Sequence, residues 1–364
     1  MRYLKNFPLH RNKNVAGRFF KKTMNQKQKA SLSKTNGINP SRVYIEGVGS
    51  YLPERVVTND DLAKIVDTSD EWIRTRTGIR QRHLASEQEA CSDLAYQAAQ
   101  QALQDAQLQP TDIDFLIVAT ITPDMPTPSA AALVQNKLGL RPIAALDINA
   151  ACAGFLYALE IARHFLQNEH SHHGLVIGSE KLSSITNWKD RSTCVLFGDG
   201  AGTVVVGKDS GLTILDNIVG ADGSAASLIC VPAGGSLQPA SLQTVEAHLH
   251  SITMNGGELF KAAVRHMTEA VTTILQRNSL TTADIRYLIP HQANMRIVQA
   301  LSQQLSFPME QMICNIDQTG NTSSASIPIV LAQAKAARRF QPGDRILLVA
   351  FGGGLTWGAT LLQQ

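Results

Sequence analysis

The chain has 364 residues, of which 44% are hydrophobic and 17% charged, a composition typical of a folded globular protein with a large core. No apolar run reaches the ~18 residues of a membrane-spanning helix, so we expect no membrane anchor. Residues 1–40 carry ten Lys/Arg and no Asp/Glu, which leaves 23 Lys/Arg (33 less ten) against 30 Asp/Glu in the rest. The net charge of +3 therefore comes from one end and does not indicate a nucleic-acid-binding body.

Residues 1–40 are expected to form a basic, disordered N-terminal extension. Lys, Asn, Gln and Ser are abundant there, and no apolar segment is long enough for a secretory signal. The lack of acidic residues is shared with organellar transit peptides, so a plastid or mitochondrial location is the alternative to the cytoplasm. A start at Met24, or an arm that binds RNA or a membrane surface, are further alternatives.

The cysteines and histidines give no metal-binding pattern. The five cysteines lie far apart without a C-x-x-C pair, which favours a reducing compartment and excludes a zinc ribbon; they are Cys91, Cys152, Cys194, Cys230 and Cys314. The one histidine cluster, at 170–173, lies in a polar connection where exposure to solvent explains it. We therefore expect no bound metal.

Apolar strands alternate with amphipathic helices from residue 42 onward, a pattern that predicts an α/β fold with both sheet faces covered. The first half should contain strands at 42–49, 115–120, 143–148, 175–177 and 202–207, and helices at 59–65, 70–75, 92–107, 129–138 and 152–167. The second half should contain a surface excursion at 221–250, helices at 257–276, 295–305 and 323–338, and strands at 286–289, 345–351 and 356–362. Asn59, Ser69 and Ser92 are the expected helix caps.

The chain also repeats itself. Residues 111–117 resemble 283–289, and 149–154 resemble 321–326, both at an offset of 172 (287 − 115 and 321 − 149). A third pair, Phe197-Gly-Asp-Gly-Ala-Gly and Phe351-Gly-Gly-Gly-Leu, is offset by 154 (351 − 197). These echoes predict one unit used twice, with halves at 41–211 and 212–364, and not a short-period solenoid.

Cys152 is the candidate nucleophile because it lies where an apolar strand runs into an apolar helix. The unpaired N–H groups and the dipole of a first helical turn favour the thiolate. In the repeat, Ala119 stands where the second half has His291, and Ser324 stands where the first half has Cys152. Two halves packed face to face would bring Cys152, His291 and Asn321 together.

Each of these residues taken alone has a commoner structural explanation. A buried cysteine is usually inert packing, and we assign that role to Cys91, Cys194, Cys230 and Cys314. Asn321 could be a helix cap, and a lone histidine is more often structural. The order Cys, His, Asn also occurs in papain-like proteases, but the Cys-Gly-Ser-Cys-Trp context is absent. Residues 197–202 lack the full dinucleotide-binding fingerprint.

Four segments taken together resemble the thiolase-fold superfamily and, within it, the 3-oxoacyl-acyl-carrier-protein synthase III family. They are Asp67–Gly78, the Cys152 segment, His291–Asn294 and Phe351–Gly358. The resemblance runs from about Val43 to the C-terminus and implies a thiolase-like α/β fold, in which duplicated βα halves form a layered α-β-α-β-α sandwich. Elongating synthases of this fold pair the cysteine with two histidines, and degradative thiolases place a second cysteine before the C-terminal glycines. Asn321 and Phe351 stand at those two positions here.

The resemblance implies an acyltransferase. An acyl-CoA would condense with malonyl-acyl-carrier protein through an acyl-cysteine intermediate, releasing CoA and CO₂ and forming 3-oxoacyl-acyl-carrier protein at the start of type II fatty-acid synthesis. A starter-unit ketosynthase or acyltransferase of secondary metabolism is the alternative on the same scaffold. A non-enzymatic carrier-binding protein would leave three reactive residues unexplained. The implied partners are acyl carrier protein, acyl-CoA and a second copy of the chain, without nucleic acid, membrane, metal or redox cofactor.

The resemblance also implies a role for each site residue. Cys152 would carry the acyl group, and His291 and Asn321 would stabilise the malonyl enolate. The remaining assignments are an oxyanion hole with Gly353, an apolar wall at Phe351, CoA contacts from Trp72, Arg191, Arg76, Thr68 and Asn294, carrier-protein contacts from Lys261, Arg265 and Arg296, and an acyl-pocket contribution across the dimer from Thr127.

Overall fold

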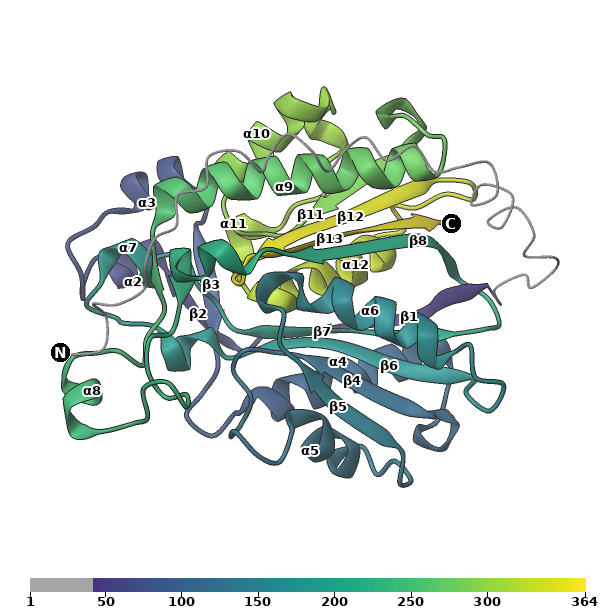
Figure 1. The fold of residues 1–364 in the computed structure, drawn as a ribbon, viewed down its shortest axis with the longest axis horizontal. Helices are drawn as coiled ribbons and strands as arrows, with labels where there is room; N and C mark the ends of the chain where they lie inside the picture. Colours follow the sequence, from purple (N-terminus) through teal and green to yellow (C-terminus); the bar gives the residue numbers. More distant parts are fainter. Residues whose placement is uncertain (1–41) are drawn as a thin grey trace, which may run out of the picture. The chain divides into compact units, whose positions relative to one another are not determined.

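The computed structural model describes residues 42–364, which belong to one compact unit, so the expected disorder of residues 1–40 lies outside the described residues. The main sheet has nine strands in the order β11-β12-β13-β8-β1-β7-β6-β4-β5 (Figure 1). Their bounds are β1 Val43–Tyr51, β4 Phe115–Ala119, β5 Ala144–Ile148, β6 His173–Glu180, β7 Gly200–Gly207, β8 Leu212–Ala221, β11 Tyr287–Pro290, β12 Arg345–Gly352 and β13 Thr356–Gln363.

The longer helices separate into three layers around this sheet. Helices α4 (Cys91–Ala106) and α5 (Ala130–Lys137) cover the first-half strands, and α9 (Gly256–Arg277) and α10 (Met295–Leu305) cover the second-half strands (Figure 1). Helices α6 (Gly154–Phe165) and α12 (Ser326–Ala336) lie between the halves, where their apolar side chains share one core with strands from both. The predicted α-β-α-β-α sandwich is confirmed.

The two halves repeat one topology. The first half runs β5-β4-β6-β7-β1, and the second runs β11-β12-β13-β8, with Met312 bridging to Leu288 at the place of the fifth strand. Backbone outliers repeat as well: φ is +46° at Ala151 and +48° at Ser323, 172 residues later (323 − 151). The predicted duplication is therefore confirmed. The boundary between residues 211 and 212 stays a prediction, because residues 41–364 form a single compact unit.

Two of the three predicted helix caps are wrong. Thr58 caps α2 (Asn59–Leu62) by accepting the Asp61 N–H, while the Asn59 side chain is buried and donates to the Ile79 carbonyl at 2.8 Å. Helix α4 begins after Ala90, whose N–H is bonded by the Asp93 carboxylate at 2.9 Å. Ser69 does cap α3 (Asp70–Thr77), as predicted.

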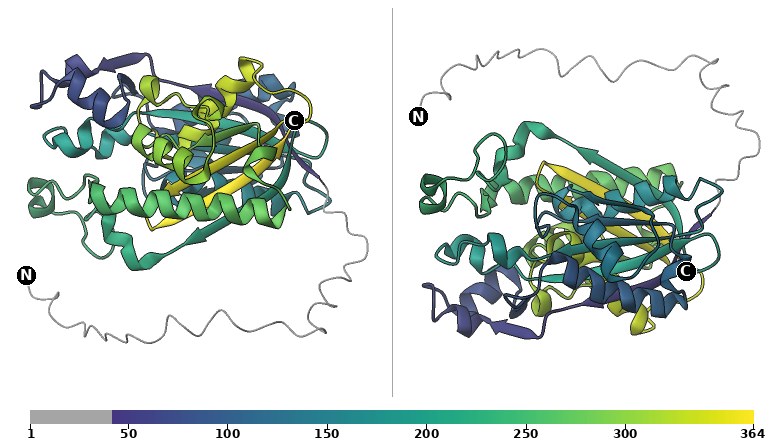
Figure 2. Two further views of the ribbon diagram at one scale, coloured as in Figure 1. Left: turned by 90° about the horizontal axis from the view of Figure 1, so that it is seen from above. Right: turned by 90° about the horizontal axis from the view of Figure 1, so that it is seen from below.

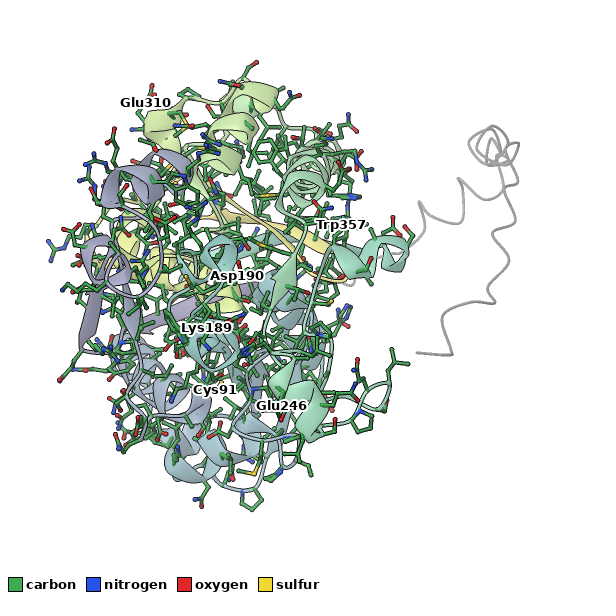
Figure 3. The ribbon with its side chains drawn as sticks, turned by 90° about the vertical axis from the view of Figure 1, so that its left-hand side faces the viewer. Cys91, Lys189, Asp190, Glu246, Glu310 and Trp357 are labelled. Atoms are coloured by element: carbon green, nitrogen blue, oxygen red, sulfur yellow. The ribbon has the colours of Figure 1, made fainter. Side chains whose placement is uncertain are left out.

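Several short elements were not predicted from the sequence. Strands β2 (Arg55–Thr58) and β3 (Gln81–Leu84) form a small separate sheet, and β9 (Ile229–Cys230) pairs with β10 (Thr253–Met254). Strands of two to four residues are too short for a period of two to be counted. The predicted excursion between β8 and α9 projects from the body and carries α8 (Leu242–Glu246), with Glu246 labelled in Figure 3 (Figures 2 and 3).

Two further short helices among residues 42–364 are α7 (Arg191–Cys194) and α11 (Ile316–Thr319). None of the helices between residues 42 and 364 combines the length and the hydrophobicity that crossing a bilayer requires.

Gly178 of β6 offers a test of how tightly the halves meet. A Cβ at this position would lie 2.4 Å from the carbonyl oxygen of Ser324, a backbone atom of the other half. Gly178→Ala should therefore lower the free energy of unfolding by about 1–3 kcal/mol, measured by urea denaturation. The control is Gly235→Ala, where an added Cβ meets nothing within 4 Å. Equal stability of the two variants would contradict the close approach.

Candidate active site

Cys152 lies in η2 (Ala151–Ala153), a 3₁₀ turn between β5 and α6, so the helix begins two residues later than predicted. The turn is held from the second half, where the Thr356 hydroxyl donates to the Ala150 carbonyl at 2.8 Å. Gly352 packs against it so closely that a Cβ there would lie 2.6 Å from the Cys152 nitrogen. The position of the thiol is thus set by the second half as much as by its own.

The three predicted reactive side chains line one cavity of about 140 Å³. Cys152 comes from the first half, and His291 and Asn321 come from two separate segments of the second. Gly353, Phe351 and Asn294 line the same cavity. Packing of the halves therefore brings together six of the residues that the sequence singled out.

His291 follows β11 and is 3% exposed. Its backbone N–H donates to Val349 at 2.8 Å, and its Nδ1 lies 2.7 Å from the Ser326 hydroxyl. Burial lowers the pKa of His291 to about 3, so the imidazole is neutral at physiological pH. Because the hydroxyl of Ser326 can donate to Nδ1 or accept from it, Nε2 can act as an acceptor or as a donor.

Ser326 was not predicted from the sequence as the partner of His291. The sequence feature that could have indicated it is its place at the start of α12, five residues after Asn321.

Asn321 is fixed by backbone bonds on both sides. Its N–H donates to Leu196 at 2.8 Å, and its carbonyl accepts from Gly198 at 3.0 Å. The side-chain Oδ1 accepts the Ser323 N–H at 2.8 Å. The Nδ2 group is therefore the part of the amide left to donate a hydrogen bond to a ligand in the cavity.

Cys152 is not poised as a thiolate. Burial raises the pKa of its thiol to about 12, and the carboxyl of Glu180 adds to this whenever it is ionised. The expected lowering of the thiol pKa is not found, because burial raises the pKa more than the hydrogen bonds from Ser323 and from the Cys152 backbone lower it. The thiol must lose its proton as it reacts, and the neutral His291 in the same cavity is the available base.

A second cavity, of about 620 Å³, reaches Cys152 from another side. Leu182, Phe197 and Ile252 give it apolar walls, and Ser323 also lines it. These wall residues were not predicted from the sequence, since isolated apolar side chains on connections carry no periodic signal. This cavity has the size and lining for an acyl chain.

The predicted CoA-binding residues other than Asn294 form a cluster outside the cavity. The guanidinium carbons of Arg191 and Arg76 lie 4.9 and 5.6 Å from the centre of the Trp72 ring. Arg191 also donates to the Asp67 carbonyl at 2.9 Å. Arg191 and Trp72 thus stack directly on each other, without room for a base between them. Thr68 stands four residues before Trp72, and its buried hydroxyl has no hydrogen-bond partner among residues 42–364.

The remaining predicted residues lie on the surface. Lys261 and Arg265 are exposed on α9, and Arg296 is exposed on α10, the helix beside it (Figure 2). The Lys261 ammonium is 2.9 Å from Glu258. Thr127 is exposed before α5 and lines neither cavity that contains Cys152.

Only one group among residues 42–364 has side chains close enough to share a metal ion, namely Glu46, His173 and Asp209. His173 Nδ1 lies 2.9 Å from Glu46 Oε2, so a hydrogen-bonded ion pair accounts for the cluster. It lies at the start of β6, whereas the candidate catalytic residues gather where β5 and β11 end.

The differing environments of the cysteines predict an order of alkylation. Cys230 is exposed and should react with iodoacetamide first at pH 7.5, while buried Cys91 and Cys194 stay unlabelled. Labelling of Cys152 should rise with pH up to at least about 10 without a plateau, because burial raises the pKa of this thiol. Peptide mass spectrometry after timed labelling measures each site. A plateau for Cys152 below pH 8 would show that its thiolate forms easily.

Comparison with known proteins supports the geometry. Models of the 3-oxoacyl-[acyl-carrier-protein (ACP)] synthase III family match residues 146–223 and, for its C-terminal part, residues 275–364. The chain is 52% identical over 320 residues to beta-ketoacyl-[acyl-carrier-protein] synthase III of Caldanaerobacter subterraneus, covering 88% of this chain and 97% of that protein. The Clostridioides difficile protein of the same name is 50% identical, with the same coverage.

Solved structures agree. The crystal structure of 3-oxoacyl-[acyl-carrier-protein] synthase III from Aquifex aeolicus matches with a TM-score of 0.81 and 47% identity, covering 88% of this chain and all of that one. A priming beta-ketosynthase of the R1128 polyketide pathway also matches with a TM-score of 0.81, but at 34% identity and over 88% of this chain and 96% of that one. By its sequence, its fold and the residues gathered around Cys152, the chain belongs to the 3-oxoacyl-[acyl-carrier-protein] synthase III family.

Proposed function

We propose that this enzyme condenses an acyl-CoA starter with malonyl-acyl-carrier protein, the step that initiates type II fatty-acid synthesis. The observation that carries the proposal is the single cavity in which Cys152, His291 and Asn321 meet, in a chain about half identical to proteins named for this synthase. The secondary-metabolism alternative is not favoured, because the polyketide priming synthase is less similar than the fatty-acid relatives.

The first step transfers the acyl group to Cys152. As its sulfur attacks the thioester carbonyl, the thiol proton passes to Nε2 of His291, in the tautomer whose Nδ1–H donates to Ser326. The C–S bond to CoA then breaks, and the departing sulfur takes that proton to leave as CoA thiol. His291 can do this because it is neutral.

The second step decarboxylates the malonyl group. His291 is here in its other neutral tautomer, with Nδ1 accepting from the Ser326 hydroxyl and the proton on Nε2. Loss of CO₂ leaves an enolate, whose oxygen accepts hydrogen bonds from His291 Nε2–H and Asn321 Nδ2–H, each worth about 3–4 kcal/mol. Phe351 presents an apolar face to the malonyl carboxylate, and desolvation of that group favours neutral CO₂.

The enolate carbon then attacks the acyl-cysteine carbonyl. Backbone N–H groups of Cys152 and Gly353 hold the resulting oxyanion. Its collapse breaks the C–S bond to Cys152 and releases 3-oxoacyl-acyl-carrier protein, and the departing sulfur takes a proton from solvent to restore the thiol. The adjacent Gly352 allows this approach, since a Cβ there would collide with the Cys152 nitrogen.

CoA would enter along the surface cluster of Trp72, Arg76 and Arg191, with Thr68 near its phosphates and Asn294 at the pantetheine arm. The buried, unpartnered Thr68 hydroxyl supports a polar ligand there. Adenine would have to displace Arg191 from the face of Trp72, because the two now stack directly.

The carrier protein would dock on the exposed basic side chains of α9 and α10. Lys261, Arg265 and Arg296 lie on neighbouring helices that also line the active-site cavity, through Ala263 and Ile297. Positive side chains at this rim would steer an acidic carrier toward the opening.

A homodimer would complete the acyl pocket, with Thr127 reaching the partner's site. Strand β5 ends the main sheet, and its residues Ala-Ala-Leu-Asp-Ile are partly or fully exposed, leaving an apolar edge free to pair. The location would be cytoplasmic, in keeping with the five free cysteines.

Acylation provides the direct test. Incubation with a series of acyl-CoAs should add one acyl mass to the Cys152 peptide, and the preferred chain length would follow from the relative rates. Cys152→Ala should remain unmodified with every acyl-CoA. An adduct on another cysteine, or equal labelling of the variant, would contradict the nucleophile assignment.

Asn321→Ala separates the two half-reactions. Loss of the enolate donor should slow decarboxylation of malonyl-acyl-carrier protein by about 10²–10³-fold, while self-acylation of Cys152 falls much less. Release of CO₂ and acyl transfer are measured separately on the same preparation. Equal losses in both would show that Asn321 serves only to hold the site together.

A further inference from the structure

Glu180 is a buried carboxyl that the mechanism above does not use. It ends β6 beside the catalytic turns and is 0% exposed. Its Oε2 accepts from the Ile121 N–H at 3.0 Å and from the hydroxyls of Thr122 and Thr120 at 2.8 and 3.2 Å. Within residues 42–364 it forms no ion pair with Lys, Arg or His.

The other oxygen of Glu180 meets Ser324. The Ser324 hydroxyl lies 2.9 Å from Glu180 Oε1 and 2.8 Å from the Ala119 carbonyl oxygen. A hydroxyl has one hydrogen, and a carbonyl oxygen can only accept. Both contacts are hydrogen bonds only if Glu180 Oε1 carries a proton and donates it to Ser324, which in turn donates to Ala119.

The proton cannot sit on Oε2 with equal ease, because three donors already point at that oxygen. Burial without a neighbouring cation also disfavours the carboxylate, and it raises the pKa of Glu180. Hydrogen-bond accounting and solvation therefore agree on a neutral acid.

The duplication places this carboxyl opposite a glycine of the other half. Ser324 is the counterpart of Cys152, and Glu180 ends β6 as Gly352 ends β12 (324 − 152 and 352 − 180 are both 172). The pairing of Gly352 with Gly198 that the sequence echo at an offset of 154 predicted is therefore wrong. In the second half a glycine is required, since a Cβ would touch the Cys152 nitrogen. In the first half the equivalent position holds Glu180, whose side chain is hydrogen-bonded to Ser324, the counterpart of Cys152.

We propose that Glu180 is held as a neutral carboxylic acid and acts as a positioning residue for the condensation reaction. Its hydrogen-bond chain through Ser324 to Ala119 fixes η7 (Ser323–Ala325), and with it the Asn321 side chain that η7 orients. This role rests on the proposed function of Asn321. Ionisation of Glu180 would break the chain and place a negative charge near the Cys152 thiol.

Other ionisable groups near Glu180 do not neutralise it. Cys91 on α4 lies 3.4 Å from the Thr120 hydroxyl and, like Cys152, is a protonated thiol because burial raises its pKa. The ammonium of Lys181, the next residue, is bonded to the backbone carbonyls of Ser86 and Glu89.

Substitution by glutamine tests the protonation state. In Glu180→Gln the amide N–H replaces the acid proton toward Ser324, and the amide oxygen keeps the three donors. Acylation and decarboxylation at pH 7 should stay within about twofold of wild type, whereas Glu180→Leu should lose at least about tenfold in decarboxylation. Loss of fold or activity in Glu180→Gln would overturn the proposal. If Glu180→Leu does not fold, the activity of Glu180→Gln by itself tests whether Glu180 is a neutral acid.

Asp199 supplies the matched control. It is also 0% exposed, but donors reach both its oxygens: Ser183 N–H at Oδ1, and Ala85 N–H and the Ser183 hydroxyl at Oδ2. An amide in its place must turn its NH₂ against an N–H, so Asp199→Asn should be clearly less stable than wild type. Equal destabilisation of Asp199→Asn and Glu180→Gln would mean that Glu180 is ionised.

The rate of Cys152 alkylation gives a readout that a merely structural role would not move. At pH 7 wild type and Glu180→Gln should react at equal rates, because neither side chain carries a charge beside the thiol. A variant that reacts at least about threefold faster at pH 7 would overturn the proposal, because it would show that Glu180 is ionised in wild type. Alkylation needs no substrate, so this result is independent of whether the protein condenses any acyl-CoA.

Discussion

The close backbone contact between the two halves is the constraint on which the site depends. Turns η2 and η7 face each other at the centre of the molecule, each with a residue at positive φ. Gly352 approaches the Cys152 nitrogen, and Gly178 approaches the Ser324 carbonyl, so closely that neither position can carry a Cβ. Cys152, the proposed nucleophile, and its proposed partners are therefore placed by packed backbone, which holds them more rigidly than mobile loops would.

The two halves share one backbone geometry but hold different side chains at equivalent positions. At equivalent points the first half offers Cys152 and Ala119, while the second offers Ser324 and His291. A thiol and an imidazole thus line one cavity on one side of the contact, and a hydroxyl bonds to a backbone carbonyl and to Glu180 on the other. In the proposed function one turn is reactive and its counterpart is part of the core, so the duplicated fold has one reactive centre.

Much of this arrangement could be predicted from the sequence because duplication leaves a countable offset. That offset alone is enough to predict that Cys152, His291 and Asn321 lie near one another. Properties that depend on contacts between distant segments could not be predicted: burial reverses the expected shift of the Cys152 pKa, and Arg191 stacks on Trp72. Helix caps failed for a similar reason, since Asn59 satisfies a buried carbonyl in place of its own helix.

Before substrate binds, the ionisable side chains around the candidate site are neutral. Burial keeps Cys152 protonated and His291 neutral, and the hydrogen-bond chain of Glu180 supplies the third neutral group. An ion held here without a partner would cost several kcal/mol in lost hydration, a cost that would be carried through every step. Charge instead appears only with the substrate, as an enolate facing donors that are already in place. Positive side chains belong at the rim, on α9 and α10, where water solvates them and they can attract anionic partners without perturbing the chemistry.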